Sequence, residues 1–176
     1  MYSAGMSEPL AYFLTWHTYG TWLPGQAPGS VDDSHNAYGA PFAPADSDRL
    51  NQSVGRMADK FVTLDETRRQ AVQDAIVEVC EYRGWRLLAL HVRTTHVHAV
   101  VAASANPEKV MNDFKAYATR RLRRNQLADC ATRIWAMHGS TRYIWNEEQL
   151  TEKVAYVVDG QGAALRPAPI CRSPER

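Results

Sequence analysis

The fold is decided around residues 94–102, which read Thr-Thr-His-Val-His-Ala-Val-Val-Ala. This β-branched, apolar run predicts a β-strand. Alternate side chains of a strand point to the same face, which places His96 and His98 side by side. Two convergent neutral imidazoles make half of a divalent metal site. A short triplet of this kind is weak evidence alone, so the rest of the chain has to support metal binding.

Segments on both sides of this strand predict the other elements. Aromatic and β-branched runs between turn residues predict strands, and apolar positions repeating every three or four residues predict helices. Working outward, we expect strands at 12–18, 85–91, 96–102, 133–135 and 141–145, and helices that begin at Thr63, Asn106 and Asn146. Each helix starts at a capping residue, and the first ends at Gly84. A turn at Gly139-Ser140 is expected to separate the last two strands.

The order strand, helix, strand, strand, helix, strand, helix indicates an α+β fold. It is the split βαβ pattern of a ferredoxin-like antiparallel sheet, with an additional C-terminal helix. The helices of such a sheet cover one face, so Val97, Ala99 and Val101 are expected beneath them. His96 and His98 are then expected on the open face, where a ligand can reach them.

Length and composition favour one domain. The 176 residues are 45% hydrophobic, which suffices for a single core. We expect a domain over residues 1–162, with a long inserted loop at 24–60, and a disordered tail over 163–176. Three widely spaced cysteines, no leader-like start and no long apolar stretch favour a soluble cytoplasmic protein without a membrane span. The formal net charge of +1 means that any nucleic acid must be held by a local basic patch.

Several motifs in order along the chain carry a family resemblance. They are the His96-Val97-His98 triplet, a basic amphipathic helix, Ile134-Trp135, the segment 139–145 and Tyr156-Val157-Val158. Together they resemble the single-tyrosine HUH transposases, and most closely their REP-associated branch, over about residues 10–162. The resemblance implies a ferredoxin-like sheet, a divalent metal held by two histidines and a third polar ligand, and a tyrosine nucleophile on a helix. It also implies cleavage of single-stranded DNA beside a hairpin, through a 5′-phosphotyrosine intermediate.

Three tyrosines follow the histidine motif. Tyr117 shares the apolar stripe of its helix, and Tyr143 lies in an aromatic strand, so packing explains both. Tyr156 projects away from the apolar stripe of the last helix, and we therefore predict that it is the nucleophile. A phenol is mostly protonated at neutral pH and needs help to attack a phosphodiester, which a metal on His96 and His98 would supply.

The third metal ligand departs from the family pattern. Family members often place Gln or Asn one helical turn after the tyrosine, but here that position is Gly160. Gly160 can end the helix and redirect Gln161, so we predict His96, His98 and Gln161 as ligands of Mg²⁺ or Mn²⁺, with Asp159 as the alternative to Gln161.

Basic residues after the histidine motif suit a phosphate backbone. The candidates for nucleic-acid contact are Lys115, Arg120, Arg123, Arg124 and Arg142. A charged helix face is also commonly just solvated, and this reading stays open beside the functional one.

The combined prediction is a metal-dependent endonuclease and strand transferase for single-stranded DNA with hairpins or palindromic repeats. One alternative is a non-catalytic, domesticated nucleic-acid-binding domain. A two-histidine phosphoesterase acting on RNA ends is a further alternative, but it typically needs two His-x-Thr/Ser motifs that this chain lacks. The sequence is compatible with a monomer or a homodimer, with the tyrosine helix serving its own or the partner's site, and with a mobile or a domesticated role.

Overall fold

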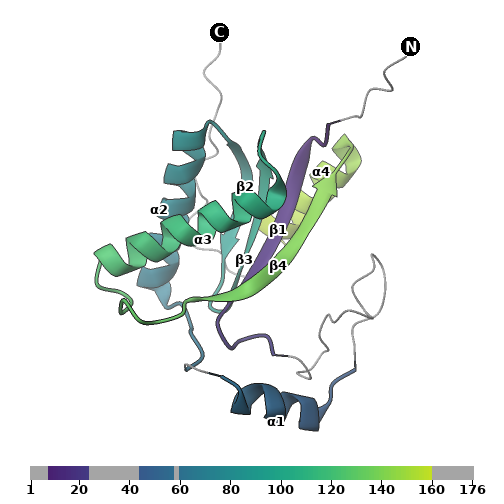
Figure 1. The fold of residues 1–176 in the computed structure, drawn as a ribbon. Coiled ribbons are helices and arrows are strands. Elements are labelled where there is room, and N and C mark those ends of the chain that lie inside the picture. The colour runs from purple at the N-terminus through teal and green to yellow at the C-terminus, as the bar shows by residue number, and fades with distance from the viewer. Residues whose placement is uncertain (1–7, 24–43, 58–59, 160–176) are drawn as a thin grey trace, which may run out of the picture.

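The computed structural model describes residues 8–23, 44–57 and 60–159. Within these ranges the strands form one antiparallel sheet in the order β2-β3-β1-β4. The strands are β1 (Ala11–Thr18), β2 (Arg86–Val92), β3 (His96–Ala102) and β4 (Trp135–Ile144). In Figure 1, α2 (Glu66–Arg83) and α3 (Pro107–Arg124) cross one face of the sheet, and α4 (Glu147–Val158) lies behind it. The predicted ferredoxin-like sheet with an additional C-terminal helix is confirmed.

The main core lies between the sheet and the pair α2 and α3. Alternate residues of β1 and β3 point into it, because side chains alternate along a strand. Its fully buried side chains include Leu14, Trp16, Val72, Ile76, Val79, Val97, Val110, Phe114 and Leu122. The helices bury one stripe here and expose their charged faces. Within the described ranges, no helix is both long and apolar enough to cross a membrane.

The opposite face of the sheet is not open as the sequence predicted. Helix α4 packs on it, and Val157 is fully buried there in a second cluster with Ala11, Phe13, Ala89, Val100 and Ile144. This packing leaves His98 only 6% exposed and His96 half-buried. The apolar stripe of the last helix needs a surface to cover, and the unoccupied sheet face supplies it.

Local capping explains most helix boundaries. The side-chain oxygens of Asn106 and Asn146 accept hydrogen bonds from the third residue of their helices, as expected, and Gly84 ends α2 with a φ of 68°. The predicted cap at Thr63 is wrong: Asp65 caps α2 by accepting from the backbone N–H of Arg68 at 2.9 Å. Leu64, which lies between Thr63 and Asp65, is outside the helix and is buried in the core.

The last strand is continuous, whereas the sequence predicted two short strands around a turn at Gly139-Ser140. Gly139 pairs with Trp16 inside the sheet. A Cβ atom at this position would lie 2.7 Å from the Thr15 carbonyl oxygen and 2.5 Å from the Met111 sulfur. The glycine is therefore needed because β1 and α3 approach it closely, and it does not make a turn.

Part of the predicted loop at 24–60 is helical. Helix α1 (Ser47–Gly55) is capped by Asp46 and buries none of its residues, so no apolar pattern marks it in the sequence. The loop prediction is wrong for these nine residues. Residues 24–43 and 58–59 and the predicted tail at 163–176 lie outside the described part of the chain.

Candidate active site

The two imidazoles of the triplet are neighbours on the α4 side of β3. The ring centroids of His96 and His98 are 4.8 Å apart. The Nδ1 atom of His98 is hydrogen-bonded to the Thr15 hydroxyl at 2.8 Å, and that of His96 to the Thr95 hydroxyl at 3.1 Å. With Nδ1 engaged in each ring, the Nε2 atoms are left to bind a ligand.

Both imidazoles are neutral at physiological pH. Burial, reinforced by the nearby histidines and Arg93, lowers the pKa of His98 to about 3. Burial, followed by His17 and Arg93, lowers the pKa of His96 to about 4. Neutral imidazole is the form that donates a lone pair to a metal, so the electrostatics of the pair suit metal binding.

Tyr156 lies beside this pair. Its ring meets the His98 imidazole edge to face, with centroids 5.7 Å apart, yet the residue stays 44% exposed. Tyr117 packs against the core under α2 and α3, and Tyr143 contacts Tyr12 on that same side of the sheet. Of the three candidate tyrosines, the structure brings only Tyr156 together with the histidines.

Phe13 forms the base of this group, a role that the sequence analysis missed. Its ring stacks on the His98 imidazole, with ring centroids 5.7 Å apart, and meets the Tyr156 ring edge to face, with centroids 5.9 Å apart. The ammonium nitrogen of Lys153 lies 6.0 Å from the same ring centroid. Lys153 stands one helical turn before Tyr156, and this spacing is the signal from which it could have been found.

Two further histidines, to which the sequence gave no role, surround the pair. His17 faces His96 across the β1 and β3 pairing, with ring centroids 5.3 Å apart, and its buried Nδ1 atom has no hydrogen-bond partner among the described residues. His91 faces His98 from β2, and its Nδ1 atom contacts the Val157 carbonyl oxygen at 3.3 Å. Burial lowers the pKa of both, so four neutral imidazoles line this part of the sheet.

A metal-binding centre is only partly assembled. Among the described residues, no three His, Cys, Asp or Glu side chains are grouped to hold a metal ion. Asp159 follows α4 as an exposed residue, and Gln161 lies outside the described ranges. The fit for a divalent cation thus rests on His96 and His98, whose ring nitrogens are suitable donors.

Lys115, a predicted phosphate contact, has a structural role instead. The residue is 8% exposed, and its Nζ atom donates to the carbonyl oxygens of Ala136, Met137 and His138. Burial lowers its pKa to about 8. Its hydrogen bonds tie α3 to β4, so the prediction of a phosphate contact is wrong for this residue.

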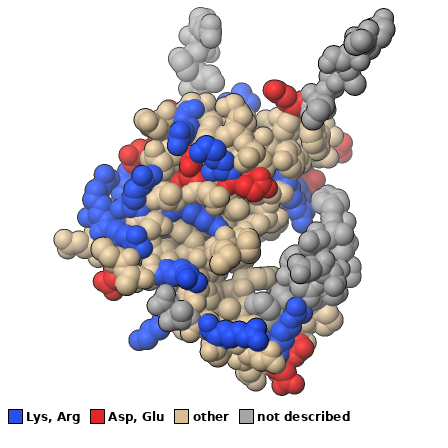
Figure 2. Space-filling view, in the orientation of Figure 1, with Lys and Arg blue, Asp and Glu red and all other residues tan. Residues whose placement is uncertain are grey.

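The other predicted basic residues divide between the two faces of the sheet. Arg120, Arg123 and Arg124 are exposed at the C-terminal end of α3, where Figure 2 shows Lys and Arg side chains gathering on the left. Arg142 is directly opposite Phe13 in the pairing of β1 with β4, so it lies on the face of the histidines. Of this set, only Arg142 is on the histidine side of the sheet.

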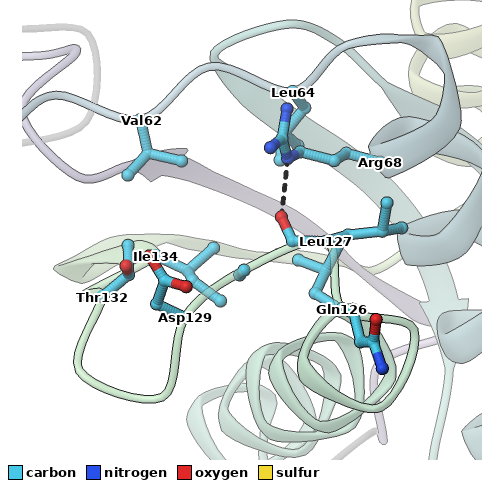
Figure 3. Close-up of a pocket in the computed structure, with 10 residues that line it drawn as sticks. Val62, Leu64, Arg68, Gln126, Leu127, Asp129, Thr132 and Ile134 are labelled. Carbon is cyan, nitrogen blue, oxygen red and sulfur yellow. Dashed lines mark hydrogen bonds between the residues drawn. The ribbon is translucent and has the colours of Figure 1, made fainter.

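A cavity of 260 Å³ lies elsewhere, among the segment before α2 and the connection from α3 to β4. Figure 3 shows Leu64, Arg68 and Asp129 on its wall, with the Arg68 Nε atom donating to the Leu127 carbonyl at 2.8 Å. Its apolar lining belongs to the core beneath α2 and α3. The histidines and Tyr156 are not part of this cavity.

Comparisons with known proteins give one family match. The model of the family "Transposase IS200 like" matches residues 53–149, a range that includes both histidines and ends before Tyr156. A solved structure of a REP-associated tyrosine transposase bound to a REP hairpin is similar at a TM-score of 0.48 and 14% identity. The similarity covers 85% of this chain and 65% of that one, so the chain spans less than two thirds of its length. No curated protein matches.

Proposed function

The chain belongs to the IS200-like transposase family of DNA-processing enzymes, and on that premise we propose that it cuts and rejoins single-stranded DNA with Tyr156 as nucleophile. The membership confirms the resemblance to tyrosine transposases seen in the sequence. The observation that carries the proposal is the contact of the half-exposed Tyr156 with the His98 imidazole at 5.7 Å between ring centroids. Although its ring also contacts Phe13, the residue is not buried by that packing, so a substrate can reach it beside a neutral imidazole.

The proposed reaction exchanges one phosphodiester for another. The Tyr156 oxygen attacks the phosphorus of the scissile linkage, the bond to the 3′-oxygen breaks, and a 5′-phosphotyrosine is formed. The phenol proton passes to solvent, and the departing 3′-oxygen gains a proton to become a hydroxyl. The same 3′-hydroxyl, or that of another end, reverses the reaction, so no external energy source is needed.

His96 and His98 are the residues that would hold a divalent cation, Mg²⁺ or Mn²⁺. Their Nδ1–H groups would donate to the hydroxyls of Thr95 and Thr15, which directs both Nε2 lone pairs to the ligand. Nitrogen donors favour Mn²⁺ over Mg²⁺. A bound cation would polarise the scissile phosphate and offset charge on the leaving oxygen. Gln161 remains our proposed third ligand, with Asp159 as its alternative.

The proposed substrate is single-stranded DNA beside a hairpin or palindromic repeat, which the sequence resemblance to the REP-associated branch implies. Arg142 would contact its backbone near the site, because it lies across from Phe13 on the same sheet face. Arg120, Arg123 and Arg124 would contact DNA only at a distance from the site, since they lie on the α3 side.

The proposal is tested by incubating the protein with single-stranded hairpin DNA and Mn²⁺ or Mg²⁺, followed by a denaturing gel. We expect a covalent adduct with the wild type and none with Tyr156→Phe, while His96→Ala and His98→Ala bind DNA but cleave it far more slowly. Tyr143→Phe is the matched control, because that tyrosine lies on the other face, and it should form the adduct normally. An adduct that persists in Tyr156→Phe contradicts the role of Tyr156. Binding without cleavage under either metal favours a non-catalytic domain.

A further inference from the structure

The ring of Phe13 joins three groups that lie far apart in the sequence. His98 stacks on it with an interplanar angle of 17°, and Tyr156 meets it at 88°. The Lys153 ammonium lies 6.0 Å from the ring centroid. A cation near an aromatic face is attracted to the ring and partly shielded from water. The lysine is therefore held on the side of α4 that also carries the proposed nucleophile.

Lys153 is unusual for its helix. It is the one basic residue of α4, whose other charged residues are Glu147, Glu148 and Glu152. An acidic helix repels a DNA backbone, so a single lysine turned toward the sheet needs a reason. Its side chain is 22% exposed, whereas the first two glutamates start the helix, where negative charge is favoured by the helix dipole.

The ion partner of Lys153 does not supply that reason. Its Nζ atom pairs at 2.7 Å with Glu152, the preceding residue, whose side chain is 66% exposed. Exposed ion pairs of this kind add little stability and are readily exchanged for a stronger anion. A phosphodiester that approaches Tyr156 is such an anion, and it would contact the partly desolvated ammonium of Lys153.

We propose that Lys153 binds the scissile phosphodiester beside Tyr156 and is a catalytic residue of this site. The inference rests on the proposed function. An ammonium at the phosphate reduces the repulsion between the phosphodiester and the attacking phenol oxygen, and it stabilises the additional negative charge of the transition state. Arg142 is paired with Phe13 in the register of β1 and β4, so both cations belong to the sheet face that carries His98 and Tyr156.

The first test measures single-turnover cleavage of the hairpin DNA by Lys153→Met and Lys153→Arg. Methionine keeps most of the side-chain volume without the charge, so we expect a cleavage rate about 10- to 100-fold lower, with substantial recovery in the arginine variant. Lys109→Met is the matched control, since Lys109 is an exposed lysine of α3 on the other side of the sheet, and it should cleave at the wild-type rate. Thermal melting of each variant shows whether the fold is intact.

The second test identifies the contact itself. In a Tyr156→Phe background, which binds without cleaving, DNA with a neutral methylphosphonate at the mapped scissile position is compared with ordinary DNA. We expect Lys153→Met to weaken binding of ordinary DNA severalfold and to leave binding of the methylphosphonate unchanged.

The outcomes separate the two proposals. Suppose that the wild type forms a Tyr156-dependent adduct and that Lys153→Met cleaves DNA at the full wild-type rate. This result overturns the inference about Lys153 and leaves the proposed function intact. Equal weakening for both DNAs also overturns it, because the lysine then acts away from the scissile phosphate. A wild type that forms no adduct overturns both.

Discussion

The two faces of the sheet contrast in what their side chains do. On the side of α2 and α3, the side chains of β1 and β3 are mostly apolar and buried, and Trp16, Val97 and Phe114 belong to one continuous core. On the side of α4, the same strands carry His17, His96 and His98 next to a smaller apolar cluster. We call the first the stable face and the second, which carries the proposed active site, the chemical face.

Most of the imidazoles of the chemical face find hydrogen-bond partners, the buried Nδ1 atom of His17 being the exception among the described residues. The hydroxyls of Thr15 and Thr95 are hydrogen-bonded to the two imidazoles of the triplet, and the Val157 carbonyl oxygen is hydrogen-bonded to the His91 imidazole. Unpaired polar groups in such a position would cost stability. The smaller core under α4 suffices because most of the apolar burial is supplied by the other face.

The largest effect on stability is expected from Phe114→Ala on the stable face, and it tests the contrast between the two faces of the sheet. Phe114 is fully buried and packs against Trp16 and Trp85, at 6.0 Å between ring centroids in both cases. We expect the free energy of unfolding to fall by about 3–5 kcal/mol, measured by denaturant titration. The cleavage rate of the folded fraction should not change. A specific loss of cleavage without destabilisation would break the division between the two faces.

A smaller effect is expected from Thr15→Val on the chemical face. The substitution keeps the shape of the side chain and removes the hydroxyl that bonds His98 at 2.8 Å. We expect Mn²⁺ affinity, measured by titration calorimetry, to fall about 10- to 100-fold, because the ring loses the partner that orients it. Unchanged Mn²⁺ affinity would show that the hydroxyl does not orient a ligand. Thr119→Val, at an α3 residue away from the histidines, is the control.

The smallest effect is expected from Arg123→Ala combined with Arg124→Ala on the exposed side of α3. If these arginines contact DNA phosphates, the slope of log affinity against log salt should become shallower by about 1 to 2. Cleavage of bound DNA should continue at the wild-type rate, because the histidine site lies across the sheet. A salt slope equal to that of the wild type would show that this end of α3 is merely solvated.

Local patterns predicted most elements of the fold. The strand at 96–102, the helix caps at Asn106 and Asn146 and the end of α2 at Gly84 follow from side chains that act on their own neighbours. The predictions failed where distant contacts decide. Gly139 is in a strand because β1 and α3 approach it, and Lys115 is buried because β4 offers it three carbonyl oxygens.

The candidate site follows the same division. The spacing of His96 and His98 and the position of Tyr156 off the apolar stripe were readable in the sequence, and the structure places these side chains together. The role of Phe13 was not, because it depends on how β1 and α4 dock. Lys153 shares a helical face with Tyr156, but its contact with Phe13 likewise depends on that docking. Gln161 stays a prediction, since it lies outside the described residues.

The sequence by itself determined that two imidazoles share one face of a strand, because the two-residue period of a strand is a local property of the backbone. Only the tertiary structure decided what that face meets. The Thr15 hydroxyl that bonds His98 lies 83 residues away along the chain, and Tyr156 reaches His98 through the packing of α4. Such contacts arise from strand pairing and helix docking, which bury apolar surface over the whole domain and are not encoded in any short segment.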